Sequence, residues 1–174
     1  MYVARTRSPG PKTAGLKTAG LIAAGVTAAG LSLAIVATGA TSLPAGASPA
    51  GTGLVISEVY GGGGNTGAPY TNDFIELYNP TDAAVSVGGW SVQYRSATGT
   101  SAQVTSLTGS VPAHGHYLVQ EAAGSTASAA LPTPDATGNI SMSGSNGVVL
   151  LVPSTTAFTA TGNLAGNPGL LDMV

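Results

Sequence analysis

The sequence predicts an all-β protein, an antiparallel β-sandwich preceded by an N-terminal export signal. Short apolar runs rich in β-branched residues alternate with turn residues, and no stretch keeps a helical spacing of apolar side chains. Only 7% of the residues are charged. The Val, Leu, Ile and aromatic content of the runs distinguishes the chain from a disordered segment. We therefore expect one small β domain.

The first part of the chain has the order of an export signal. Four basic residues precede an uncharged apolar run at 18–40, and the break at Pro44 leads into a small Ala-Gly-Ala triplet that ends at Ala47. We predict a signal peptide over residues 1–47, cleaved after Ala47, with Ala40 as the alternative site. The apolar run is long enough to span a bilayer, so an uncleaved anchor is the competing interpretation. No stable membrane span remains if the signal is cleaved.

Charge is distributed unevenly along the chain. Beyond the signal, the chain contains one basic residue, Arg95, and all seven acidic residues. Proteins that bind nucleic acids need Lys and Arg to displace phosphate counterions, so we expect no direct nucleic-acid binding. The chain has no Cys, which excludes disulfides, thiolate metal sites and a Cys nucleophile. We predict a short linker at 48–52 and one domain at 53–174, secreted to the extracellular space, with an unknown extracellular protein or envelope component as partner.

The domain begins with its clearest strand signals. A first strand is predicted at 54–59, followed by a flexible glycine-rich loop at 61–71. The run DFIELY at 73–78 alternates between two faces, as a half-buried strand does. The segment Asn-Pro-Thr-Asp at 79–82 predicts a turn, because proline presets φ and the Asn and Asp side chains bond nearby backbone groups.

Further strands are expected at 84–87 and 90–94, separated by Gly88-Gly89, which indicates a hairpin or a bulge. Trp90 is interpreted as a core anchor in preference to an exposed ligand platform. Residues 122–138 are predicted to form a long surface loop. The weaker candidate strands are 102–107, 116–120, 147–152 and 170–174.

The acidic residues pose the main chemical question. Glu58 and Glu76 lie in strand-like runs with almost no basic partner available, so each must be solvated, hydrogen-bonded or bound to a cation. Asp73, Glu76 and Asp82, together with Asn79, lie around one turn and could supply oxygens to calcium, although they do not match an EF-hand loop. Calcium ligands and hydrogen-bonded structural acids are the two alternatives, and the second is favoured.

Other potential sites have weaker support. The glycines at 61–64 resemble a phosphate-binding loop, but neither a lysine nor a helix follows, so a mobile loop between strands is favoured. His114 and His116 could contribute to a metal site, yet Pro112 and Gly115 favour a turn. The chain has no nucleophile elbow and no zinc-binding helix motif. We expect no catalytic residues, and no cofactor apart from the calcium possibility.

Three blocks in order resemble the bacterial lamin tail domain: ISEVY at 56–60, DFIELYNPT at 73–81 and VGGWSV at 87–92. The resemblance continues more weakly through 112–119 and 147–151 and covers about 53–174. It implies an immunoglobulin-like β-sandwich in an exported protein. It also implies an accessory module that has no catalytic residues to transfer.

The glycine-rich first loop is similar to lamin tail domains placed ahead of secreted nucleases of the endonuclease/exonuclease/phosphatase superfamily, whose catalytic Asp, His and Asn motifs are absent from this sequence. The family's last strand continues with Gly-aromatic-Gly, whereas this sequence stops at Val174. We therefore expect a fragment whose last strand is truncated. The leading hypothesis is a secreted non-catalytic module for binding, targeting or spacing. The alternative is the N-terminal fragment of such a nuclease, with its catalytic domain absent from this chain. A cell-surface structural protein would require the segment 1–40 to be retained.

Overall fold

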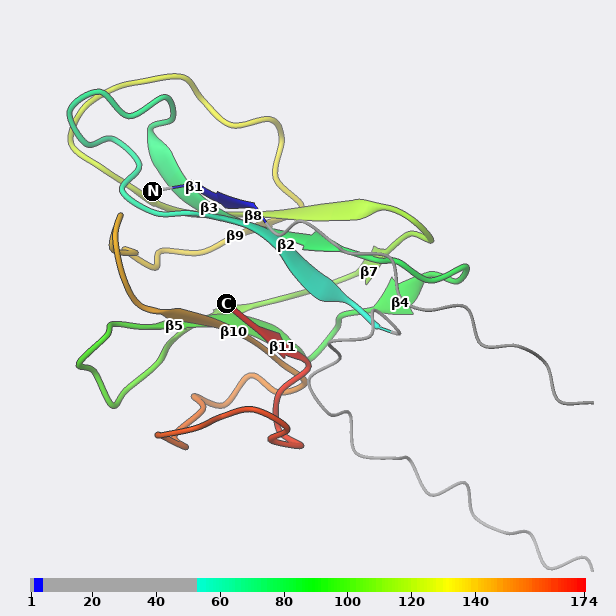
Figure 1. Cartoon of the computed structure of the whole chain (residues 1–174). Helices are drawn as coiled ribbons and strands as arrows, with labels where there is room; N and C mark the ends of the chain where they lie inside the picture. The colour runs from blue at the N-terminus through cyan, green and yellow to red at the C-terminus, as the bar shows by residue number, and fades with distance from the viewer. Residues whose placement is uncertain (1, 5–52) are drawn as a thin grey trace, which may run out of the picture. The chain divides into compact units, whose positions relative to one another are not determined.

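The computed structural model of the chain describes residues 2–4 and 53–174. These residues contain strands, turns and loops but no helix, and therefore no helix that could cross a membrane. Two main sheets lie in two layers, joined at one side by a two-stranded ribbon (Figure 1). The predicted all-β class is confirmed. The predicted cleavage sites and the linker lie outside the described residues.

The first sheet has the order β1-β2-β3-β8-β9, with antiparallel neighbours except for the parallel pair β8 and β9. Its strands are β1 (Tyr2–Ala4), β2 (Val55–Tyr60), β3 (Asn72–Tyr78), β8 (His116–Ala123) and β9 (Ala136–Thr137).

The second sheet has the order β11-β10-β5-β6 and is antiparallel throughout. Its strands are β5 (Ser91–Arg95), β6 (Gln103–Ser106), β10 (Val148–Val152) and β11 (Asp172–Met173). The ribbon pairs β4 (Val85–Ser86) with β7 (Ser110–Val111). Each strand predicted in the domain is therefore present, with bounds that differ by a few residues.

The hairpin or bulge predicted at Gly88-Gly89 is wrong. The strand before it, β4, pairs with β7, whereas the strand after it, β5, belongs to the second sheet. The two glycines form a tight turn between these sheets, in which the Trp90 amide donates to the Val87 carbonyl (3.0 Å) and Gly89 has a φ of 84°. Two adjacent glycines indicate a turn, but its direction depends on which distant strand each flanking segment meets.

The long loop predicted at 122–138 is also partly wrong. Strand β8 continues to Ala123, and β9 pairs with it in parallel, so that Val119 lies opposite Ala136. A two-residue strand is too short to produce a periodic pattern, and only its partner defines it.

The main core fills the space between the two sheets. Inward side chains of the first sheet, such as Ile75 and Leu77, pack with inward side chains of the second, such as Val92 and Leu151. Each of these four is fully buried. Trp90 is partly buried and packs against this cluster, as expected for a core anchor.

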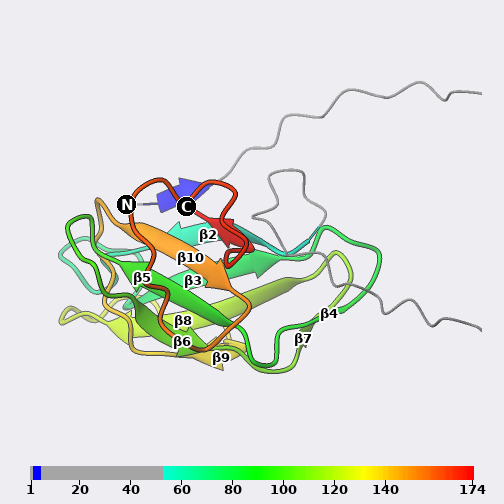
Figure 2. The same cartoon turned by 90° about the horizontal axis from the view of Figure 1, so that it is seen from below.

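A second apolar cluster lies on the outer face of the second sheet. Residues 153–171, here called the strap, cover this face (orange to red in Figures 1 and 2), and Leu164 and Leu170 of the strap pack on Leu150 and Val152 of β10. Strand β10 is therefore buried on both faces, which explains its unbroken run VVLLV.

Polar side chains of β5 hold the strap in place. The Ser91 hydroxyl donates to the Ser154 carbonyl (2.5 Å), and Arg95 donates to the Ala160 carbonyl (2.8 Å). Between them, Gln93 donates to the Thr156 carbonyl and accepts from the Phe158 amide (2.9 and 2.7 Å). Alternate side chains of one strand thus bond alternate backbone positions of the strap.

Candidate functional site

Three loops meet at the end of the sandwich where β2, β8 and β9 finish, which we call the loop end (left in Figure 1). Backbone hydrogen bonds join the first two loops, because the Thr126 amide donates to the Gly64 carbonyl (2.8 Å) and the Gly124 amide to the Thr71 carbonyl (3.0 Å). The loops are residues 61–71, 124–135 and 138–147.

Glycines allow the first two loops to touch backbone to backbone. A Cβ added at Gly124 would collide with the Gly63 carbonyl and with Gly64, and a Cβ at Gly63 would collide with the backbone of Asn72. The sequence predicted a flexible loop at 61–71. The structure shows that hydrogen bonds connect this loop to its neighbours and that glycine is needed for its close approach to them.

Asp73, near the start of β3, connects the first and third loops. Its side chain is 3% exposed, and its two carboxylate oxygens accept hydrogen bonds from the Gly63 amide (2.6 Å) and the Met142 amide (2.7 Å). Burial raises the pKa of Asp73, and these backbone hydrogen bonds oppose that shift. The carboxylate therefore works as a double acceptor that holds two loops.

Glu121 performs a related task further along the third loop. It is 1% exposed, and its Oε2 accepts a hydrogen bond from the Ile140 amide (2.8 Å). Burial raises the pKa of Glu121; the Ile140 amide and the adjacent Thr105 hydroxyl lower it, and the negative charge of Asp73 raises it. The Thr105 hydroxyl lies against the carboxyl group, yet neither Thr105 Oγ1 nor Glu121 Oε1 has a partner of good hydrogen-bond geometry among the described residues.

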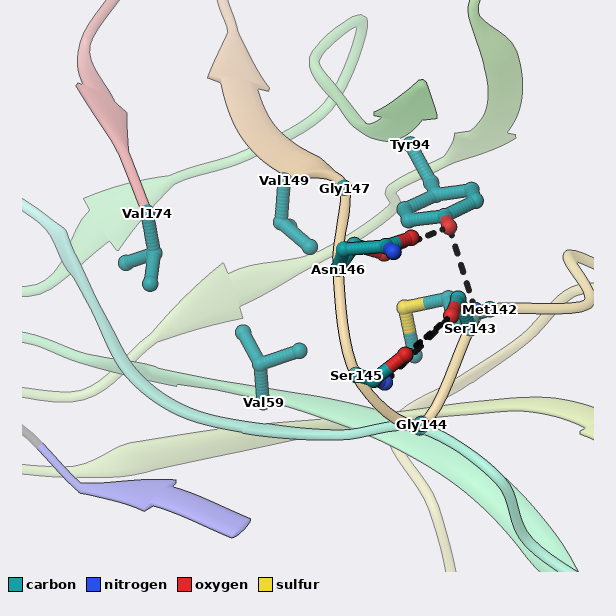
Figure 3. A pocket seen from close by; sticks show the side chains of 11 residues that line it. Val59, Tyr94, Met142, Ser143, Gly144, Ser145, Asn146, Gly147, Val149 and Val174 are labelled. Carbon is teal, nitrogen blue, oxygen red and sulfur yellow. Dashed lines mark hydrogen bonds between the residues drawn. The ribbon is translucent and has the colours of Figure 1, made fainter. Parts of the chain in front are cut away.

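A small apolar pocket opens beside the third loop (Figure 3). Its volume is about 150 Å³, and Val59, Met142, Val149 and Val174 supply most of its apolar wall. The Tyr94 ring forms another side. Its hydroxyl donates to the Asn146 carbonyl (3.0 Å) and accepts from the Ser143 amide (3.1 Å), which spans the loop that rims the pocket.

The sequence comparison decides the family. The model of the lamin tail domain matches residues 47–164, which is more than half of the chain. The chain belongs to the lamin tail domain family. A search of curated proteins found no match. The two facing sheets agree with the immunoglobulin-like β-sandwich that the resemblance implied.

In this lamin tail domain, the three residues predicted as possible calcium ligands lie apart from one another. Asp73 is buried at the loop end, whereas Asp82 lies beyond the opposite end of β3, next to His114. Glu76 lies between them along β3 and accepts a hydrogen bond from the Ser57 hydroxyl (2.7 Å). Within residues 2–4 and 53–174, no group of three or more His, Asp or Glu side chains could hold a metal ion. This arrangement favours the hydrogen-bonded interpretation of the acids.

The two histidines engage different acids. His116 Nδ1 lies 2.9 Å from Glu76 Oε1, and His114 Nε2 lies 2.8 Å from Asp82 Oδ1. His114 has a φ of 54° inside a turn closed by a hydrogen bond from the Gly115 amide to the Pro112 carbonyl. The predicted turn is confirmed, and the histidines do not converge on one point.

Sequence reasoning missed two buried acids in this lamin tail domain. Asp172 is 3% exposed, and its Oδ2 accepts a hydrogen bond from the Ile56 amide (2.9 Å), which ties the second sheet to the first. Glu121 was the other. Tyr117 and Val119 alternate with outward residues and point to the inner face of the first sheet. The same alternation, continued for two more residues, would have predicted a buried Glu121.

Proposed function

We propose that this lamin tail domain is a secreted, non-catalytic binding module that contacts an extracellular protein or envelope component through its loop end. The observation that carries the proposal is that the buried carboxylates of Asp73 and Glu121 bind the backbone of the loops. Both carboxylates accept backbone hydrogen bonds that position the loops, so they hold a surface in shape. A surface that is ordered before binding loses less conformational entropy when a partner arrives.

The composition of the loop end fits a largely uncharged recognition surface. Asn65, Thr66, Ser125 and Ser145 are exposed, small, polar and uncharged, and Asp135 at the end of the second loop is the exposed acid of the three loops. Such uncharged residues offer hydrogen-bond donors and acceptors that cost less to desolvate than charged groups. The export pattern that ends at Ala47 supports a location outside the cell.

The alternative is that the module belongs to a secreted nuclease whose catalytic domain lies elsewhere. The basis for it is the similarity of the glycine-rich first loop to modules found ahead of such enzymes. The coding sequence that follows Val174 tests it, because a nuclease domain would supply clustered Asp, His and Asn motifs. An immediate stop codon would remove this alternative.

Export and binding can be tested separately on the full chain. Expression in a secreting host should release a product whose first residue, by mass spectrometry, is Ser48; a product that retains residue 1 would contradict secretion by cleavage. For binding, the purified protein is titrated against envelope preparations and extracellular proteins of the source organism. Introducing lysine at the loop end, as Thr66→Lys with Ser125→Lys, should weaken saturable binding by about tenfold.

The matched control is Ser86→Lys with Ala84→Lys, two exposed positions at the other end of the sandwich. It adds the same kind of side chain and should leave binding unchanged. Equal loss with the control variant, or no saturable binding by the unmodified protein, would refute a binding role for the loop end. Nuclease activity that copurifies with the chain and disappears in Asp73→Asn would refute the non-catalytic interpretation.

A further inference from the structure

Strand β2 pairs with β3 on one side, and on its outer side the short β1 is its only strand partner among the described residues. One half of its outer edge is already closed. The register with β3 shifts between Ile56 and Glu58, and the Ile56 amide donates to Asp172 instead of to another strand. Bulges and side chains of this kind prevent further strand pairing. The other half, from Glu58 to Tyr60, remains competent to pair.

Strand β1 demonstrates that this half-edge accepts a strand. Tyr2–Ala4 pairs with it in antiparallel register, with Tyr2 opposite Tyr60, Val3 opposite Val59 and Ala4 opposite Glu58. The occupying segment comes from the predicted signal peptide. Cleavage after Ala47 would therefore vacate the half-edge in the secreted protein. Its backbone groups would then be available to another extended segment.

The apolar pocket lies directly inside this half-edge. Val59 and Gly61 form its wall on the β2 side (Figure 3). Residues directly opposite each other on paired strands share one face of the sheet, so the residue opposite Val59 stands on the pocket side. A volume of about 150 Å³ suits one branched or aromatic side chain. The pocket and the half-edge can thus recognise one segment together.

Charge defines the rest of the occupant. Glu58 lies opposite Glu76 across β2 and β3, and two like charges in this position repel each other. Residues 53–174 contain all seven acidic residues and one basic residue. The two carboxylates favour a basic side chain close to Glu58 over an acidic one. In the segment that occupies the edge, the residues after Ala4 are Arg-Thr-Arg. A second copy of β2 would bring another Glu58 instead, which disfavours self-pairing.

We propose that the half-edge from Glu58 to Tyr60 is a strand-acceptor site for an extended segment of a partner protein, with an apolar side chain opposite Val59 and Arg or Lys near Glu58. The chain's own N-terminal segment fills this site while it is attached, and its removal opens the site. The inference gives the proposed binding module a second, separate surface and a partner chemistry.

The test uses the full chain and a fluorescent peptide, Tyr-Val-Ala-Arg-Thr-Arg, followed by fluorescence anisotropy. Val3→Pro removes a backbone donor from β1 and should open the edge; deletion of residues 2–4 is the second opening variant. Either variant should bind the peptide at least about tenfold more tightly than the unmodified chain. Because neither change touches the main core, the melting temperature should be preserved, and the Val59 amide should exchange faster.

Charge reversal provides the specificity control. The opened protein should bind the peptide with Arg replaced by Glu about tenfold more weakly, and Glu58→Lys in the opened protein should reverse this preference. Equal binding to the opened and unmodified chains, or a preference that ignores the charge at position 58, would overturn the proposal. The loop-end lysine variants do not alter this edge. If the peptide fails to bind the half-edge, the binding test of the loop end therefore still stands on its own result.

Discussion

Replacing Glu121 with glutamine tests whether its carboxylate holds the third loop by shape or by charge. Glutamine keeps one oxygen for the Ile140 amide, and its NH₂ group can donate to the Thr105 hydroxyl, which lacks a good partner in the described structure. It also removes an ionisable carboxyl group, whose pKa is raised by burial, from a site that is 1% exposed. One new hydrogen bond is worth about 1 kcal/mol, and removal of a buried ionisable group acts in the same direction. We expect Glu121→Gln to leave stability unchanged or to raise it by about 1 kcal/mol.

Asp73→Asn is the matched comparison, because both acids are buried and both have a raised pKa. Asp73 uses both oxygens as acceptors, for the amides of Gly63 and Met142. Asparagine has a single oxygen, so its NH₂ group would face one of these N–H donors. Leaving a buried donor unsatisfied costs about 1–3 kcal/mol. We expect a loss of about 2 kcal/mol, partly offset by removal of the buried charge.

The measurement is urea unfolding of the full chain at pH 7.5, followed by the fluorescence of Trp90, the single tryptophan. If the number of accepting oxygens decides the outcome, Glu121→Gln cannot lower the free energy of unfolding by about 2 kcal/mol or more, and Asp73→Asn cannot leave it unchanged. Either result would refute this explanation. Aspartate and glutamate carry the same charge, so a charge-only account predicts the same sign for both variants.

The same two acids determine a pH dependence. Their pKa values are raised in the folded protein from ordinary values of 3.8 and 4.5, so the folded chain binds more protons than the unfolded chain just above those values. The contribution of these acids to stability is therefore greatest below their ordinary pKa values and decreases as pH rises through the raised ones. Glu121→Gln should flatten this decrease. If the stability of the variant fell more steeply with rising pH than that of the unmodified chain, the attribution of this decrease to Glu121 would be wrong.

The remaining predictions concern the loops, the strap and calcium. Gly124→Ala should destabilise the protein by about 2 kcal/mol, because its Cβ meets backbone, whereas Gly67→Ala, in open space with positive φ, should cost about 1 kcal/mol in the same urea assay. Equal costs would refute the close-approach argument. Gln93→Ala should increase hydrogen exchange of the Phe158 amide while the amide of Ile75 in the main core stays protected; unchanged exchange at both would refute the role of Gln93. Addition of calcium or of a chelator should shift the melting temperature by less than about 1 °C, and a clear rise with calcium would revive the calcium site.

The strand content of the domain was predictable because it depends on local pattern. DFIELY alternates because each side chain on a strand points to the face opposite its neighbour, and β3 follows that alternation, with Ile75 and Leu77 inside. The run VVLLV was recognised as a strand, although its two buried faces became clear only when the strap was seen to cover one of them. The resemblance to the lamin tail domain also rested on such local blocks, and the family model matches residues 47–164.

Pairing and chemistry needed the tertiary structure. Gly88-Gly89 indicates a turn, but its joining of two sheets depends on β7, which is distant in sequence. The bond between Ile56 and Asp172 spans 116 positions, and the two oxygens of Asp73 reach loops on either side of it in the chain. The sequence by itself determined extended segments and their buried faces, since these follow from neighbouring residues, and it predicts an export signal. Only the tertiary structure decided which acids became acceptors for backbone amides, because burial and partner come from segments far apart along the chain.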